Sequence, residues 1–195
     1  SAPARASDYQ AALDEGYASL EAADWSSASK SFKKAAKLRK NDADEAIWGQ
    51  ALIPIYKGDF KKAKGQCKKF VAKHKKSPWS HTCLGYAYLV WKKWGSAQSS
   101  FDKALELDAD FALALAGKAH ALVIALKSDE AVGLYKEALD ADPENIEALM
   151  GLADVYLSDG KTSEAVKLLR RAVQAHPGSS RAHLALGRAL GKGPE

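Results

Sequence analysis

The sequence is poor in the residues that build covalent frameworks, membrane spans and flexible linkers. Its 195 residues include two cysteines, one methionine, six prolines and 14 glycines. Two cysteines cannot form a disulfide framework, and no uninterrupted apolar run reaches the roughly 18 residues that a membrane-spanning helix needs. Proline and glycine are too scarce for a collagen or a disordered linker. With 47% hydrophobic and 27% charged residues, the composition indicates a folded protein.

The two ends carry no clear helical pattern. SAPARAS at the start and GKGPE at the end are rich in small or helix-breaking residues. We therefore expect residues 1–8 to be frayed or disordered and residues 191–195 to form a flexible tail. We expect no targeting or transmembrane segment within these residues, and the sequence leaves the compartment unknown.

Small residues recur along the chain with a period of 34 residues. Ala63, Ala97, Ala131 and Ala165 are each 34 apart, and Ala28 precedes them by 35. A second series of small residues lies upstream of the first and comprises Gly16, Ala51, Gly85, Ala119, Ala153 and Gly187. A fixed period of this length is typical of a repeat protein.

Each repeat unit predicts two amphipathic helices. In the second helix of the third unit, Ala97, Phe101, Ala104 and Leu105 fall on one face. Small residues allow two helices to cross closely. Larger residues fill the space between successive helix pairs, in the series Phe32, Phe101, Tyr135 and Leu169.

These residues resemble the tetratricopeptide repeat family, a helix–turn–helix unit of 34 residues. The closest match is His81-x-x-Leu84-Gly85-x-x-Tyr88, followed by Ala97, Phe101 and Ala104. The resemblance implies an all-α, right-handed α–α superhelix, a solenoid, forming a single domain over residues 9–190. Its five repeats span 9–43, 44–77, 78–111, 112–145 and 146–179, and a C-terminal capping helix spans 180–190.

The second repeat departs from the pattern at three positions. Phe70 stands where the other repeats have alanine, and Cys67 replaces the aromatic residue. Pro54 lies inside the first helix, where it removes one backbone hydrogen bond. We expect this helix to be kinked or broken and the repeat to be bent.

No catalytic or metal-binding motif is present. The sequence has no HExxH, CxxC pair, Walker loop or GxSxG, and it predicts no enzyme, no cofactor and no metal. His81 and His183 replace the tryptophan of the repeat and are expected to be packing residues. The spacing of Cys67 and Cys83 does not fit a zinc knuckle, so we expect two reduced thiols, which favours a reducing, cytoplasmic compartment.

In such a superhelix the first helices line a concave groove. Apolar residues are expected on its walls and small ones on its floor, which leaves room for a partner's side chains. Because these side chains face the groove, folding is not expected to depend on them. The predicted groove residues are Trp48, Gly49, Leu52, Tyr56, Trp79, Cys83, Tyr86, Leu113, Gly117, His120 and Ile124. The alternative is that some of them pack on one another or on the N-terminal segment.

One function known in this family can be tested against the sequence. Co-chaperones that hold the C-terminal carboxylate of heat-shock proteins use Lys, Asn and Arg on consecutive first helices. The corresponding positions here include Leu13, Tyr17, Gly49, Trp79 and Cys83. We therefore expect no carboxylate clamp for a chaperone tail.

Positive charge is concentrated in the first two repeats. Residues 30–76 contain 15 Lys and Arg against four Asp and Glu. The lysines of the second helices predict a basic convex face, formed by Lys33, Lys34, Lys37, Lys61, Lys62, Lys68 and Lys69. Such a face can bind a partner or can simply be solvated.

The sequence therefore predicts a non-catalytic scaffold or assembly factor for protein–protein interaction. Its partner would be a protein or peptide with an apolar or amphipathic segment, bound in the concave groove. The alternative is binding of nucleic acid, an anionic membrane surface or an acidic protein through the basic convex face. Self-association through an end repeat is a third hypothesis.

Overall fold

A computed structural model describes residues 2–39 and 43–191, with side chains from residue 6 onward. Over this part of the chain it contains eleven α-helices and no strand. The prediction of an all-α solenoid built from helix–turn–helix repeats is confirmed.

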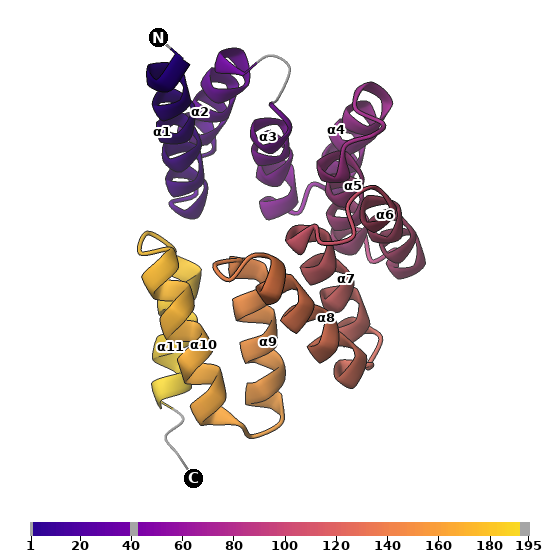
Figure 1. Cartoon of the computed structure of the whole chain (residues 1–195), viewed down its shortest axis with the longest axis vertical. Coiled ribbons are helices and arrows are strands. Elements are labelled where there is room, and N and C mark those ends of the chain that lie inside the picture. The colour runs from indigo at the N-terminus through magenta and orange to yellow at the C-terminus, as the bar shows by residue number, and fades with distance from the viewer. Residues whose placement is uncertain (1, 40–42, 192–195) are drawn as a thin grey trace. The chain divides into compact units, whose positions relative to one another are not determined.

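The helices pair in the order that the repeat predicts (Figure 1). First helices of the repeats are α1 (Ala2–Glu21), α3 (Asp44–Tyr56), α5 (Pro78–Val90), α7 (Ala112–Ile124) and α9 (Ile146–Ser158). Second helices are α2 (Trp25–Leu38), α4 (Phe60–Lys73), α6 (Trp94–Leu107), α8 (Ser128–Ala141) and α10 (Thr162–Ala175). Helix α11 (Ser180–Gly191) is the last one in the described residues, and it takes the place of a first helix.

Two boundaries lie apart from those expected. Helix α1 begins at Ala2, so it includes residues that the sequence assigned to a frayed segment. Helix α11 extends to Gly191, and residues 192–195 of the expected tail lie outside the described residues.

Short polar caps define where several helices begin. The carboxylates of Asp24 and Asp59 accept hydrogen bonds from the backbone N–H groups of Ser27 and Lys62, each at 3.0 Å. Hydrogen bonding from Ser27 lowers the pKa of Asp24, because it favours the charged form. These caps satisfy donors that the first turn of each helix leaves unpaired.

Pro54 does not break its helix. Helix α3 has 13 residues, the same length as α5, α7 and α9. Pro54 lies in the last turn of α3, where only Ile55 and Tyr56 follow it in the helix. The expectation of a broken helix is wrong, because the missing N–H falls where the helix is about to end. That the helix is kinked and the repeat bent stays a prediction.

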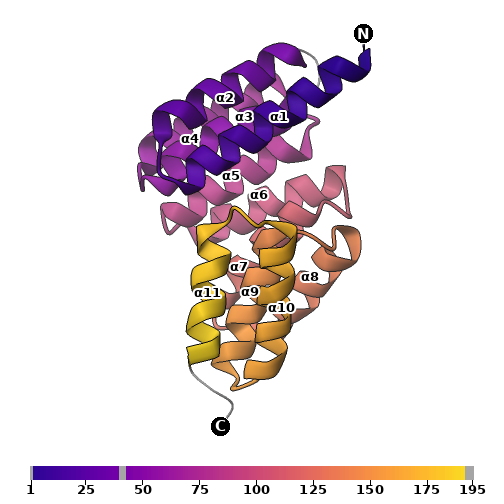
Figure 2. The ribbon, with the colours of Figure 1, turned by 90° about the vertical axis from the view of Figure 1, so that its left-hand side faces the viewer.

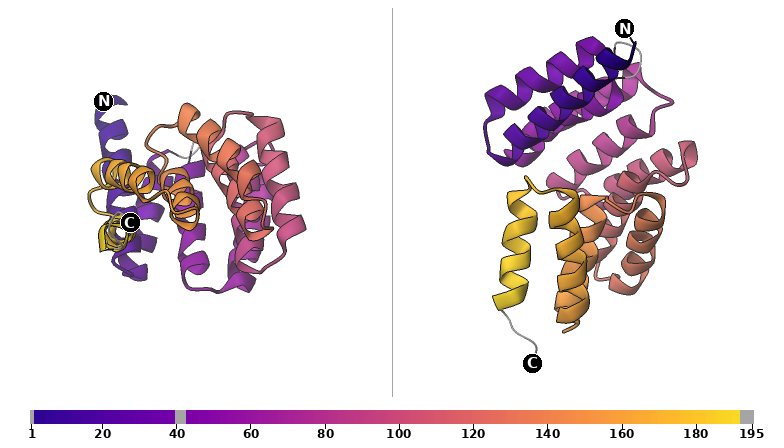
Figure 3. Two further views of the ribbon diagram at one scale, coloured as in Figure 1. Left: turned by 90° about the horizontal axis from the view of Figure 1, so that it is seen from below. Right: turned by 60° about the vertical axis from the view of Figure 1, so that its left-hand side comes forward.

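The chain divides into two compact units, which we call the N-terminal unit (Ser1–Lys93) and the C-terminal unit (Trp94–Glu195). In the N-terminal unit, α2 packs between α1 and α3, α4 packs on α3 and α5, and the first helices α1, α3 and α5 are neighbours (Figure 2). In the C-terminal unit, α7 contacts α6, α8 and α9, and α10 contacts α9 and α11, the yellow helix of Figure 3. That residues 9–190 act as a single domain stays a prediction.

The core of each unit is built from small residues and a few large ones. Phe32, Phe101 and Tyr135 from second helices are almost completely buried, as is Leu169. Alanines at the predicted crossing positions, such as Ala63, Ala97 and Ala131, are fully buried as well. The 34-residue series therefore marks the interior of each unit.

Candidate functional site

Aromatic side chains gather on the first helices of the N-terminal unit. The rings of Trp48 (α3) and Tyr86 (α5) pack with centroids 5.2 Å apart. Trp48 is only 4% exposed, whereas Tyr86 is half-buried and Tyr56 at the end of α3 is 37% exposed. The expectation that folding does not depend on these side chains is wrong for Trp48, which belongs to the core.

The small residues expected to form an open floor are covered instead. A Cβ atom at Gly49 would clash with the ring of Phe32, and one at Gly117 would clash with the ring of Phe101. Each ring comes from the second helix that precedes the glycine. The expected room for a partner's side chains is therefore already filled at these two positions.

Cys83, the third predicted floor residue, is bonded to Cys67. The two sulfur atoms form a disulfide between α4 and α5, with Cα atoms 5.4 Å apart. The expectation of two reduced thiols is wrong. Sequence spacing shows that these cysteines do not fit a zinc site, but only the pairing of the helices shows that they face each other.

A polar contact on the first helices escaped the sequence analysis. The Tyr17 hydroxyl of α1 donates to the Glu45 carboxylate of α3 at 3.5 Å. Burial and the nearby negative charge of Glu45 raise the pKa of Tyr17, so this phenol stays neutral and keeps its proton for the bond. The edge of the aromatic surface is thus held by a hydrogen bond between two repeats.

The predicted residues of the C-terminal unit lie on α7. Leu113 and Ile124 are half-buried and His120 is exposed. Charged groups follow on the neighbouring first helices, where Arg181 (α11) makes two hydrogen bonds to the Glu147 carboxylate (α9) at 3.0 and 3.3 Å. The first-helix surface of this unit is therefore more polar than that of the N-terminal unit.

The basic face predicted from the sequence stays a prediction, and its lysines can be located in the structure. All seven lysines of α2 and α4 assigned to it lie at the surface. The charge bias continues beyond them, because residues 60–101 contain ten lysines and no Asp, Glu or Arg. The second helices of the N-terminal unit thus present a surface of one sign.

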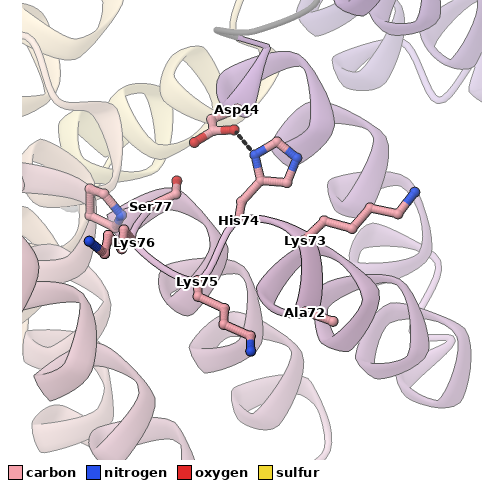
Figure 4. Close-up of a pocket in the computed structure, with 8 residues that line it drawn as sticks. Asp44, Ala72, Lys73, His74, Lys75, Lys76 and Ser77 are labelled. Carbon is pink, nitrogen blue, oxygen red and sulfur yellow. Dashed lines mark ion pairs between the residues drawn. The ribbon is translucent and has the colours of Figure 1, made fainter.

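An open basin of about 560 Å³ lies at the turn from α4 to α5 (Figure 4). Lys73, Lys75 and Lys76 surround it, and His74 forms an ion pair of 2.8 Å with Asp44 on its wall. The basin extends the positive surface of α4 to the end of that helix.

A stack of aromatic rings adjoins the basic face and was missed by the sequence analysis. Trp91 lies nearly parallel to Phe60 and to Tyr88, with interplanar angles of 8° and 11°. The ammonium group of Lys64 lies 3.7 Å from the centroid of the Trp91 ring, a cation–π contact. Phe60 follows one turn and Trp91 begins another, so no helical period links them.

Four of the five histidines contact backbone or carboxylate groups, and the contact of His74 with Asp44 is given above. His81 and His183 each lie 3.0 Å from the carbonyl oxygen of the residue six positions earlier, Lys75 and Pro177. His176 lies 2.6 Å from the carbonyl oxygen of Glu144. Over the described part of the chain, no group of three or more His, Cys, Asp or Glu side chains could hold a metal ion. Within the same residues no helix is long and apolar enough to cross a membrane.

Sequence models of the tetratricopeptide repeat match residues 84–146 and residues 127–189. Together these matches cover more than half of the chain. The chain belongs to the tetratricopeptide repeat family. Curated proteins give no significant sequence match to this chain.

Solved structures of other proteins are similar in fold. TTC0263, a thermophilic TPR protein of Thermus thermophilus, is 21% identical, with a TM-score of 0.71 over 93% of this chain and 98% of that one. A structure of MamA protein is 22% identical, with a TM-score of 0.50 over 87% of this chain and 92% of that one. At these identities the similarity concerns the fold alone.

Membership in the tetratricopeptide repeat family gives the broad class of function. This fold serves as a scaffold for protein–protein interaction, and it is generally non-catalytic.

Proposed function

We propose that the first-helix face of the N-terminal unit binds an apolar or amphipathic segment of a partner protein. This face consists of Trp48, Leu52, Tyr56, Trp79 and Tyr86. The observation that supports it is a partly exposed Tyr86 ring packed on the buried Trp48, with the exposed Tyr56 at the end of the same helix as Trp48. Aromatic residues are enriched at the centres of interfaces.

The residues of this face differ in exposure, so they would play different roles in binding. Trp48 packs against the Tyr86 ring, and with 4% of its surface exposed it offers a partner almost no contact area. A partner helix or strand would contact the side chains that keep some exposed surface, which are Leu52, Tyr56, Trp79 and Tyr86. Charged residues of α1, including Asp14 and Glu15, are exposed and would border the complex.

The experiment is a selection of peptides from a displayed library on the immobilised protein, followed by fluorescence anisotropy of the selected peptides. We expect apolar residues at i, i+3 or i+4, and i+7 in the selected sequences. Replacing Tyr56 and Tyr86 by alanine should weaken binding by roughly 2 kcal/mol or more. Circular dichroism of the same variants shows whether folding is retained.

The control is the reversal Lys61→Glu, Lys62→Glu, Lys68→Glu and Lys69→Glu on the basic face. This variant should bind the selected peptides with nearly unchanged affinity. Loss of binding in the lysine variant, with full binding by the tyrosine variant, would contradict the proposal.

A second candidate function uses the basic face. It is supported by the exposure of its seven lysines and by the absence of acidic residues from 60–101. Its partner would be an acidic protein, nucleic acid or an anionic membrane surface. Binding of this kind weakens steeply as salt concentration rises, whereas binding to the aromatic face should change little. Titrations of an acidic peptide, single-stranded DNA and anionic vesicles at two salt concentrations distinguish these ligands.

A further inference from the structure

Successive repeats interlock through a large side chain and a small one. The Phe32 ring of α2 packs against Gly16 of α1, where an added Cβ would lie 2.6 Å from the ring. The same ring packs against Gly49 of α3. In the C-terminal unit, Phe101 packs against Gly117 and Tyr135 packs against Gly151 in the same way. A ring from one second helix thus covers a glycine of the next first helix.

Cys67 and Cys83 occupy this interlock between the second and third repeats. They are 16 residues apart, as are Phe101 and Gly117, and Tyr135 and Gly151. Both cysteines have no exposed surface. The position of the ring and the position of the glycine are therefore joined here by a covalent bond between α4 and α5.

We propose that the Cys67–Cys83 disulfide replaces the aromatic–glycine interlock and makes the α4–α5 contact sensitive to redox conditions. A dithiol would reduce it by transferring two electrons and two protons, which leaves two cysteine thiols and one oxidised dithiol. Reduction removes the link between α4 and α5. Because α5 carries Tyr86, which packs on Trp48 of α3, the loosening reaches the first helices.

Other features of α4 and α5 weaken the contact between these helices, so its stability depends more on the disulfide. Three buried side-chain oxygens have no hydrogen-bond partner within the described residues, and all three belong to this region: those of Gln66, Ser77 and Thr82. Gln66 and Thr82 are the immediate neighbours of the two cysteines in sequence. Unpaired buried polar groups destabilise the packed state. Lysines without acidic neighbours along α4 add electrostatic repulsion.

Burial of the bond also determines how it can be reduced. A reductant cannot reach sulfur atoms that have no exposed surface, so α4 and α5 must first separate locally. The rate of reduction therefore reports the opening of this contact.

The experiment uses the full 195-residue protein, purified without reductant and divided into samples with and without dithiothreitol. Alkylation after denaturation, read by mass spectrometry, should show two free thiols only after reduction. Thermal unfolding followed by circular dichroism should shift downward on reduction, by on the order of 10 °C for a loop of this length. Hydrogen exchange should accelerate in residues 60–90 and stay unchanged in residues 146–191.

Two double variants distinguish the effect of the covalent bond from the effect of filling the space between α4 and α5. Cys67→Phe with Cys83→Gly restores the interlock of the other repeats, and its unfolding should not respond to dithiothreitol. Cys67→Ser with Cys83→Ser has neither the ring nor the bond, and it should unfold at a lower temperature in both samples.

Three results would overturn the proposal. The first is two alkylated cysteines in the sample that never met reductant. The second is identical unfolding of the oxidised and fully reduced protein. The third is a response of the Cys67→Phe, Cys83→Gly variant to dithiothreitol. Should that variant fail to fold, the comparison of the oxidised and the reduced wild-type protein still tests the proposal.

Discussion

At the scale of single residues, the glycines of the first helices are required by the rings that cover them. Gly49 is buried in the interior of α3, a place where glycine normally weakens a helix. Its value lies in the space that it leaves for the Phe32 ring. Gly49 thus lowers the stability of its own helix but allows two repeats to pack together.

This role predicts the effect of adding one methyl group. Gly49→Ala should destabilise the protein by about 1–3 kcal/mol, because the buried Phe32 ring must move. Urea unfolding followed by circular dichroism measures the change.

Gly65→Ala is the matched control. Gly65 is an exposed residue inside α4, and an added Cβ would meet no atom within 4 Å beyond its chain neighbours and the adjacent backbone of its own helix. Alanine there should stabilise by about 0.5–1 kcal/mol, because it favours the helix. If both variants changed stability in the same direction, close packing would not be the reason for Gly49.

At the scale of helices, the sequence predicted most of the pattern. The expected starts of the repeats at 44, 78, 112 and 146 coincide with the first residues of α3, α5, α7 and α9. Periodicity identifies helices well because the same small residues return at every crossing.

What the sequence could not provide is the side chain that enters from a neighbouring helix. The sequence predicted free space at Gly49 and Gly117, because the periodicity of one helix does not show which side chain of another helix covers a glycine. Phe101 and Gly117 are 16 residues apart, as are Tyr135 and Gly151, and Cys67 and Cys83 have the same separation. Only the packing of the helices shows that residues at this separation touch. The Phe60–Trp91 stack joins the first residue of α4 to the residue that caps the end of α5, so the period along one helix does not reveal it.

Pro54 permits a test at the end of a helix. Pro54→Ala supplies an N–H that can donate to the carbonyl of Gln50, and we expect a gain in stability of up to about 1 kcal/mol. Pro78→Ala is the control, because Pro78 begins α5, where a missing N–H costs nothing. Urea unfolding of both variants measures the difference. A loss of more than about 1–2 kcal/mol for Pro54→Ala would mean that the buried ring is required for packing.

At the scale of the whole molecule, the two units differ in charge. Residues 1–93 carry 18 Lys and Arg against nine Asp and Glu, whereas residues 94–195 carry 11 against 15. The N-terminal unit therefore repels itself more strongly than the C-terminal unit does. Its stability should depend on the ionic strength of the solution.

We expect the unfolding temperature to rise by a few degrees when salt is raised from about 0.01 M to about 0.1 M, where screening shortens from about 30 Å to about 10 Å. Circular dichroism melts at the two concentrations measure it. The variant Lys61→Glu with Lys62→Glu should show a smaller rise, because it removes part of the excess charge. A fall with added salt in the wild type would mean that ion pairs such as His74–Asp44 outweigh the repulsion.

The disulfide has a consequence for the biogenesis of the protein. Within these 195 residues Cys67 has one intramolecular partner, so oxidation cannot produce a mispaired isomer of the single chain. Cys67 is synthesised first, and α5 must follow before the partner thiol is in place. Formation of this disulfide thus calls for an oxidant that acts after both helices have been synthesised, and the 195 residues offer that oxidant only one pairing.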